Sequence, residues 1–191
     1  MTPEVRPVRP AEHDAVGRLT VAAYDAVGRV SDEYRQALTA VADRLDQDTH
    51  VLVAVEHDTV MGSVTVVGGC SPHFEHRGHG DGGFRMLAVA PHAQGRGVAG
   101  RLLDAVLEHA QGHGWRRITI TTMSWMQRAH RLYEAAGFAR RPDLDVRFAS
   151  GIGVCYALDL TADAAAHFPP PGPVPDEPPA FVPHAERPPG C

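Results

Sequence analysis

The spacing of apolar residues changes along the first half of the chain and predicts helices followed by strands. Apolar side chains recur every three to four positions from Ala11 to Ala23 and again from Tyr34 to Leu45, as in amphipathic helices. Ser31 is an N-cap candidate for the second segment, because acidic residues occupy the first turn after it. The runs VLVAVE (51–56) and VMGSVTVV (60–67) are rich in β-branched residues, and the short link between them predicts an antiparallel hairpin.

The second half of the chain alternates between strand-like and helix-like patterns. The expected elements are a strand at Phe84–Ala90, a helix at Val98–Ala110, a strand at Arg116–Thr122, a helix at Gln127–Ala136 and a last strand at Val154–Leu160. With a short strand at Val5–Val8, the predicted order is β-α-α-β-β-β-α-β-α-β. This order indicates a mixed α/β fold.

Composition and charge narrow the class of protein. A chain of 191 residues with a net charge of -5 suits one domain, and no basic face of the kind that binds nucleic acid is evident. The N-terminus is polar and no apolar run approaches the ~20 residues of a membrane span. Cys70, Cys155 and Cys191 are far apart, which predicts no disulfide framework and a reducing compartment. We therefore expect a cytoplasmic protein that binds neither nucleic acid nor membranes.

Proline dominates the sequence after Asp163, where the chain reads HFPPPGPVPDEPPAFVPHAERPPGC from position 167. Such a composition does not build a packed element. We expect one folded domain over residues 1–162 and a disordered tail over 163–191. A ligand for a proline-recognising partner is the alternative for this tail.

The stretch from Gly95 to Gly100 reads G-x-G-x-x-G, the spelling of a dinucleotide-binding fingerprint. That fingerprint needs glycines directly after a strand and an acidic residue about 20 positions later. Here a five-residue linker, Ala90–Gln94, separates strand from glycines, and WRRITITT occupies the later position. The preceding strands also look antiparallel, and no Gly-Lys-[Ser/Thr] of a P-loop is present. We therefore set aside a dinucleotide or P-loop site.

The same glycines still predict an anion-binding turn. Gly95, Gly97 and Gly100 allow a tight backbone just before a helix, where amide groups and the helix dipole favour negative charge. Arg96 adds a positive side chain. A diphosphate is a suitable ligand for such a turn, and a glycine-rich helix entry without a ligand is the alternative.

Two motifs at matching separation resemble the GNAT superfamily of acyl-CoA-dependent N-acyltransferases. Residues 94–99, QGRGVA, match its [Arg/Gln]-x-x-Gly-x-[Gly/Ala] motif, after a strand and exit reading LAVAP. Residues 129–138, AHRLYEAAGF, resemble its A-x-x-L-Y-x-x-x-G-F helix. The resemblance covers about Val5 to Leu160 and implies a mixed, mostly antiparallel sheet that splays between its fourth and fifth strands, with helices on both faces.

The resemblance also implies roles for particular residues. The CoA diphosphate would be held by the loop at Gln94, Gly95, Arg96, Gly97, Val98, Ala99 and Gly100. The pantetheine arm would pair with the strand at Leu87, Ala88 and Val89, whose last N–H could polarise the thioester carbonyl. Tyr133 would be the general acid that protonates the leaving thiolate, and its alternative role is that of a core tyrosine.

The sequence departs from the family pattern at two places. Met126 occupies the position where the family often has an asparagine that contacts pantetheine. The approach to the fourth strand, DGGFRM (81–86), lacks the glutamate that often serves as base or water holder. Asp81, His79 or a chain of waters could supply the base.

Other polar residues have open interpretations. His73, His76 and His79 lie in the loop 70–82, where a solvated loop is the simpler interpretation and a metal or base the alternative. Trp125 either lines an acceptor pocket or packs, whereas Cys155 lies in a strand and is expected to be a buried apolar residue.

These observations favour an acetyl-CoA-dependent N-acetyltransferase that transfers an acetyl group to a primary amine by direct attack in a ternary complex. Acetyl-CoA is the expected cosubstrate, no metal is expected, and the acceptor is a small-molecule or peptide amine. A homodimer is implied by the resemblance. The alternative is a non-catalytic acyl-CoA-binding or regulatory module, for which the two departures argue.

Overall fold

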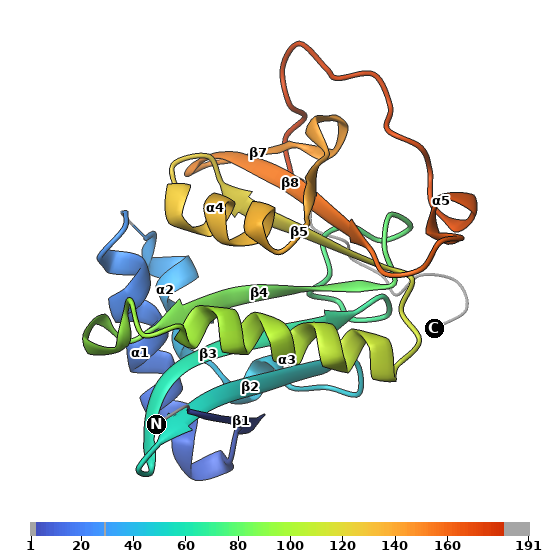
Figure 1. Cartoon of the computed structure of the whole chain (residues 1–191). Coiled ribbons are helices and arrows are strands. Elements are labelled where there is room, and N and C mark those ends of the chain that lie inside the picture. Colours follow the sequence, from blue (N-terminus) through green and yellow to red (C-terminus); the bar gives the residue numbers. More distant parts are fainter. Residues whose placement is uncertain (1–2, 29, 182–191) are drawn as a thin grey trace. The chain divides into compact units, whose positions relative to one another are not determined.

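The computed structural model describes residues 3–28 and 30–181 of the chain (Figure 1). The chain forms two compact units, one built from Met1–Val67 and Phe84–His109 and the other from Gly68–Gly83 and Ala110–Cys191. Within the described residues, no helix combines the length and the hydrophobicity that crossing a bilayer requires.

The first unit contains a sheet of mostly antiparallel strands. Its strands are β1 (Glu4–Pro7), β2 (Thr49–Glu56), β3 (Thr59–Gly68) and most of β4 (Gly82–Val89). β1 pairs with β2 and β2 with β3, both antiparallel, and β4 lies next to β3. His57 and Asp58 both have positive φ, as a tight two-residue hairpin turn requires. The predicted hairpin is confirmed.

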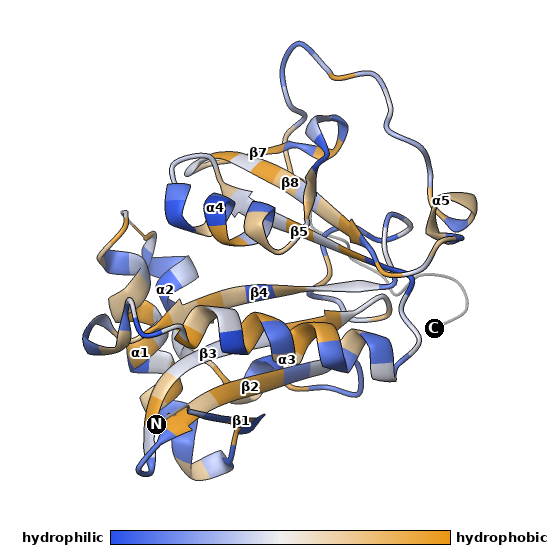
Figure 2. Ribbon diagram, in the orientation of Figure 1, coloured by the Kyte–Doolittle hydropathy of each residue, from blue (hydrophilic) through white to orange (hydrophobic). Residues whose placement is uncertain are grey.

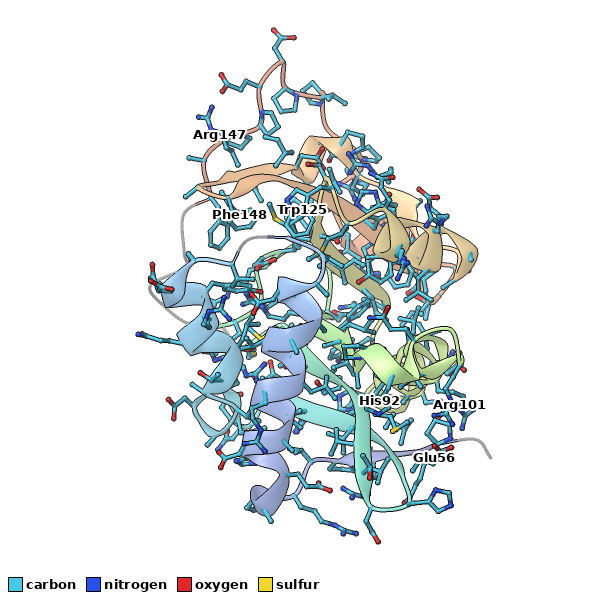
Figure 3. All side chains as sticks on the ribbon, turned by 90° about the vertical axis from the view of Figure 1, so that its left-hand side faces the viewer. Glu56, His92, Arg101, Trp125, Arg147 and Phe148 are labelled. Atoms are coloured by element: carbon cyan, nitrogen blue, oxygen red, sulfur yellow. The ribbon has the colours of Figure 1, made fainter. Side chains whose placement is uncertain are left out.

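Helices cover both faces of this sheet (Figures 1 and 3). α1 (His13–Asp25) and α2 (Asp32–Thr39) lie on one face, and α3 (Val98–Gly112) lies on the other. β2 and β3 are therefore buried along most of their length, and β2 carries mainly apolar side chains (Figure 2). Val16 of α1 packs with alternate valines of β2 in one core cluster. Among the described residues, the short 3-10 helices η1 (Pro10–Glu12), η2 (Ala42–Arg44) and η3 (Pro91–Ala93) belong to this unit, and η4 (Pro142–Leu144) belongs to the second.

The second helix is shorter than its apolar pattern predicted. Ser31 caps it as expected, because its Oγ accepts the Tyr34 N–H at 3.2 Å. The helix ends at Thr39, and η2 follows it. Val41 is nevertheless fully buried, whereas Leu45 is 38% exposed. The extension of the helix to Leu45 is wrong, because the apolar spacing continued by coincidence into a turn.

The second unit is built around the antiparallel pair β5 (Arg117–Met123) and β8 (Gly151–Asp159). β6 (Ala139–Arg140) and β7 (Val146–Phe148), which the pattern did not predict, also pair with β8. α4 (Gln127–Ala135) is closed by Gly137, whose φ is +89°, and the Phe138 N–H donates to the Tyr133 carbonyl at 3.0 Å. This helix closure is confirmed.

The strand order is β1-β2-β3-β4-β5-β8-β6, with β7 also on β8. β4 and β5 pair in parallel, with the register Gly82–Ile118, and both residues belong to the second unit. The other registers that the structure gives are antiparallel. The predicted mixed, mostly antiparallel sheet that splays between its fourth and fifth strands is confirmed.

The proline-rich segment makes defined contacts within the second unit as far as residue 181. It contains the short helix α5 (Ala164–His167), and Ala180 then pairs in parallel with Arg147 of β7. The ring of Phe181 lies 4.9 Å from that of Phe148. The expectation of disorder for 182–191 falls outside the described residues.

The cysteines differ from expectation at one position. Cys70 is disulfide-bonded, so the inference of a chain without disulfides is wrong and the argument for a reducing compartment loses its support. Cys155 is a free thiol with no exposed surface, as predicted for a buried strand residue.

Candidate functional site

The loop between β4 and α3 has the backbone of an anion site. Gly95 and Gly97 both have a φ of +76°, a conformation that side-chain-bearing residues rarely adopt. In the described part of the chain, the N–H groups of Gly95, Arg96 and Gly97 have no backbone acceptor. They precede the N-terminus of α3, a 15-residue helix whose dipole favours negative charge there. The loop is exposed, so its amides are available to a ligand.

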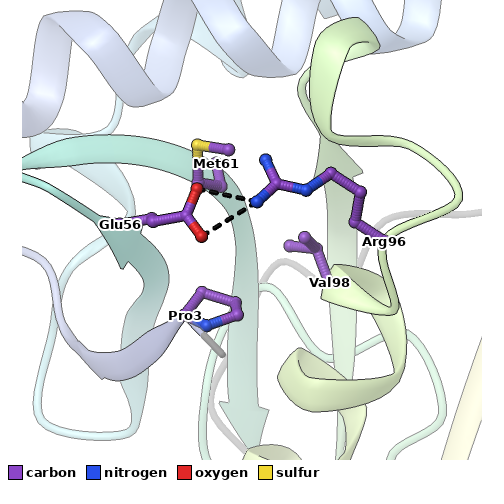
Figure 4. A pocket seen from close by; sticks show the side chains of 5 residues that line it. All are labelled: Pro3, Glu56, Met61, Arg96 and Val98. Carbon is purple, nitrogen blue, oxygen red and sulfur yellow. Dashed lines mark hydrogen bonds and ion pairs between the residues drawn. The ribbon is translucent and has the colours of Figure 1, made fainter. Parts of the chain in front are cut away.

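Arg96 does not add a free positive charge to this loop, contrary to the sequence-based expectation. Its Nη2 donates to both carboxylate oxygens of Glu56, at 2.8 and 2.9 Å (Figure 4). The hydrogen bond from Arg96 holds the pKa of Glu56 below its ordinary value. The two side chains line a small pocket with Pro3, Met61 and Val98. The positive character of the loop therefore rests on its amides, because Glu56 neutralises the guanidinium.

The strand that leads into the loop has polar backbone groups on its outer edge. The Ala90 N–H donates to the Met61 carbonyl at 2.9 Å, so alternate residues of β4 face β3. Leu87 and Val89 are out of phase with Ala90 and direct their N–H and C=O groups to the opposite edge. Within the first unit β4 is the edge strand, so this edge is suited to pairing with an extended ligand.

Gly62 on β3 sets how closely α3 approaches the sheet. A Cβ there would lie 2.8 Å from the Ala88 carbonyl oxygen and 3.0 Å from side-chain carbons of Val98 and Leu102. A larger residue would push α3 away from the sheet. The glycine thus helps to fix the position of the helix N-terminus that follows the loop.

Tyr133 lies in the second unit, on α4. It is 6% exposed, and its ring lies 5.9 Å from that of Phe138 and 6.2 Å from that of Tyr156. Burial raises the pKa of Tyr133 above its ordinary value. The phenol therefore keeps its proton at physiological pH, which is the form that a proton donor needs.

The two side chains considered as a base differ in suitability. Asp81 accepts hydrogen bonds from both the backbone N–H and the guanidinium of Arg116. Burial raises its pKa, but these bonds outweigh burial and leave the pKa of Asp81 below its ordinary value, so it is a poor base. Burial, together with the positive charge of Arg141, lowers the pKa of His79. Its Nδ1 is buried without a hydrogen-bond partner, so His79 is the neutral candidate.

His76 is part of a buried cluster and is not a solvated loop residue. It is 6% exposed, and its Nε2 hydrogen-bonds to Thr121 Oγ1 at 2.5 Å and contacts Cys155 Sγ at 3.1 Å. Burial raises the pKa of the Cys155 thiol, which is therefore protonated and a weak nucleophile. Among the described residues, no group of three or more His, Cys, Asp and Glu side chains could hold a metal ion.

Trp125 and Met126 immediately precede α4. Met126 occupies the N-cap position without a side-chain hydrogen bond to the helix. Trp125 is 38% exposed and lies in the turn before it (Figure 3). Arg147 and Phe148, on β7 in the same unit, contact the proline-rich segment.

The sequence was compared with models of protein families. Residues 16–138, more than half of the chain, match the acetyltransferase (GNAT) family. The chain belongs to the GNAT acetyltransferase family. A search of curated proteins returned no match.

Solved structures of GNAT proteins share the fold. A GNAT-family acetyltransferase from Desulfovibrio desulfuricans has a TM-score of 0.64 at 22% identity, covering 83% of this chain and 99% of its own. One from Brucella melitensis, in complex with acetyl-CoA, has a TM-score of 0.57 at 21% identity, covering 83% and 88%. Aminoglycoside 6'-acetyltransferase type Ii has a TM-score of 0.64 at 15% identity, covering 83% and 97%. The predicted GNAT fold is confirmed.

No local pattern in the sequence indicates the Glu56–Arg96 pair or the contacts of His76. Glu56 precedes its partner by 40 positions, and Cys155 follows His76 by 79. The useful signal for Glu56 was its place at the end of an otherwise apolar strand.

Proposed function

We propose that this GNAT protein is an acetyl-CoA-dependent N-acetyltransferase that acetylates a primary amine by direct attack in a ternary complex. The observation that carries the proposal is the loop at 95–97. It contains two left-handed glycines and three exposed residues whose amides have no backbone acceptor, just before the start of α3. In a chain of this family, such a loop suits a diphosphate.

The residues of the first unit fit CoA. The amides of Gln94 to Gly100 would hold the diphosphate, and the outer edge of β4 over residues 87–89, at the backbone groups of Leu87 and Val89, would pair with the pantetheine arm. The carbonyl and amide groups of this edge match the amides of an extended pantetheine. The Val89 N–H would hydrogen-bond to the thioester carbonyl and polarise it.

Bound acetyl-CoA supplies the acetyl group and a thiolate leaving group. The amine nitrogen forms the new bond to the acetyl carbon as the carbon–sulfur bond breaks. Tyr133, held neutral by burial, donates its proton to the departing sulfur. A base takes a proton from the amine, and His79 is the better of the two candidate side chains because Asp81 is engaged by Arg116.

The proposal is tested by release of free thiol from acetyl-CoA across a panel of amines, with calorimetry of CoA binding alongside. We expect thiol release that depends on both protein and amine. Tyr133→Phe should lower turnover and leave the dissociation constant of CoA nearly unchanged. Phe138→Leu, in the same aromatic cluster, is the packing control.

A non-catalytic CoA-binding module is the second candidate. Met126 in place of the family's frequent asparagine, and the absence of a glutamate from the stretch DGGFRM (81–86) around the start of β4, favour it. Such a module would bind CoA in calorimetry but release no thiol with any amine of the panel.

Homodimerisation stays a prediction, which light scattering after size exclusion tests.

A further inference from the structure

The first unit contains a buried guanidinium that has no acidic partner. Arg44 of η2 is 6% exposed. Its Nη2 donates to the Leu38 carbonyl and its Nη1 to Thr65 Oγ1, each at 3.2 Å, and Nη1 also contacts the sulfur of Met86. These acceptors are all neutral, and Nε is buried without a partner. The charge of Arg44 is therefore not balanced by its hydrogen bonds.

The other buried arginines that the structure describes provide a comparison. Arg117 is 6% exposed and pairs with Asp159, and Arg141 is 6% exposed and pairs with Asp143. Buried charges normally need such a partner, because removing an ion from water is costly. Arg44 departs from this pattern, and the charged side chain that acts on it electrostatically is another cation, Arg85.

The surroundings of Arg44 adjoin the strand proposed to hold the cosubstrate. Met86 has a φ of +53°, an unfavourable conformation for a residue with a side chain, and it brings its sulfur against the guanidinium. A thioether is a weak acceptor that a carboxylate would readily replace. Met86 also immediately precedes Leu87, where the proposed pantetheine edge begins.

We propose that Arg44 binds a carboxylate of the acceptor, so that the substrate class is an amine that also carries a carboxylate, such as an α-amino acid. This inference rests on the proposed acetyl transfer. The planar edge of the guanidinium at Nε suits two parallel hydrogen bonds to a carboxylate. The carboxylate is assigned to the acceptor because the diphosphate of CoA is already assigned to the loop at 94–100.

The first test compares matched acceptors in the thiol-release assay. L-Phenylalanine, L-methionine, L-glutamate and L-lysine are each paired with their α-carboxamides. The amides have the less basic amine and thus the larger reactive fraction, so intrinsic reactivity favours them. We expect kcat/KM for at least one acid to exceed that of its amide by about tenfold or more. Amides that are used as well as the acids in every pair would overturn the inference.

The second test changes Arg44. Arg44→Gln should lower the acid-to-amide ratio of kcat/KM by about tenfold to a hundredfold, because it removes a charge-assisted pair. Arg35→Gln, the same change in the exposed ion pair between Arg35 of α2 and Asp25 of α1, should leave the ratio unchanged. The dissociation constant of CoA should be the same in Arg44→Gln and wild type. A weaker CoA complex would place Arg44 in the cosubstrate site and overturn the inference.

The third test needs neither a variant nor turnover. The melting temperature of the wild-type protein is measured with the acid and with its amide at equal concentration. The acid that is preferred in kinetics should raise it more than the amide. Stabilisation by acids without thiol release from any amine would support the carboxylate site and refute the acetyl transfer. Thiol release with no preference for acids in either assay would support the acetyl transfer and refute the carboxylate site.

Discussion

Replacing Gly97 by alanine isolates the contribution of the left-handed loop to anion binding. The φ of Gly97 is +76°, and a Cβ added there would meet no atom within 4 Å. Sterics with neighbours therefore contribute nothing, and the change imposes only the backbone cost of that conformation. For a residue with a side chain this cost is about 1–2 kcal/mol.

The cost appears in one of two measurements. If the loop of the free variant keeps its shape, the free energy of unfolding falls by that amount, which lowers the melting temperature by about 2–8 °C for a chain of this size. If the loop of the free variant relaxes, restoring the left-handed turn makes the free energy of CoA binding less favourable by the same amount. The dissociation constant of CoA then rises by about 5-fold to 30-fold. Thermal unfolding and calorimetry on one preparation measure both quantities.

Gly112→Ala is the matched control. Gly112 ends α3, has open space at its Cβ position and does not have a left-handed φ, so alanine there should leave CoA affinity unchanged and should not lower the melting temperature. A Gly97→Ala variant with the melting temperature and the CoA affinity of wild type would contradict this prediction. It would mean that the left-handed turn is not needed in the state that binds CoA.

Three further changes test other parts of the site. Tyr133→Phe should lower kcat by about 100-fold, as loss of general acid catalysis predicts, with CoA affinity unchanged in calorimetry. Met126→Asn should supply the missing N-cap of α4 and stabilise the protein by about 1 kcal/mol in denaturant unfolding; an unchanged midpoint would contradict this. The hydrogen bond from Arg141 lowers the pKa of Asp143 from 3.8 to about 2. The stabilisation from this ion pair is present above pH 3.8 and is lost as the pH falls toward 2. Asp143→Asn should therefore make the free energy of unfolding less dependent on pH across that range.

Local patterns predicted those parts of the fold in which neighbouring residues decide the structure. The hairpin at 57–58, the Ser31 cap and the closure of α4 at Gly137 all follow from residues within a few positions of one another. β6 and β7 escaped prediction because they have two and three residues and carry no clear alternation. Their strand character comes from pairing with β8, which a local pattern does not contain.

The candidate site was predictable where the backbone makes it and not where distant side chains do. The glycines at 95 and 97 marked the loop, because left-handed backbone has a residue signature. The neutralisation of Arg96 by Glu56 and the burial of His76 depend on contacts between segments far apart in sequence. Arg44 looked like an ordinary polar residue beyond a helix, since only its burial and its neutral partners make it unusual.

Acetyl transfer from acetyl-CoA to an amine is tested most directly by measuring both products of one reaction. Acetyl-CoA, protein and an amine from the panel are incubated together, and free thiol and N-acetylated amine are quantified by absorbance and mass spectrometry. Both products should form in equal amounts for at least one amine, and Tyr133→Phe should slow the formation of both equally. Binding of CoA without N-acetylated product from any amine would contradict acetyl transfer.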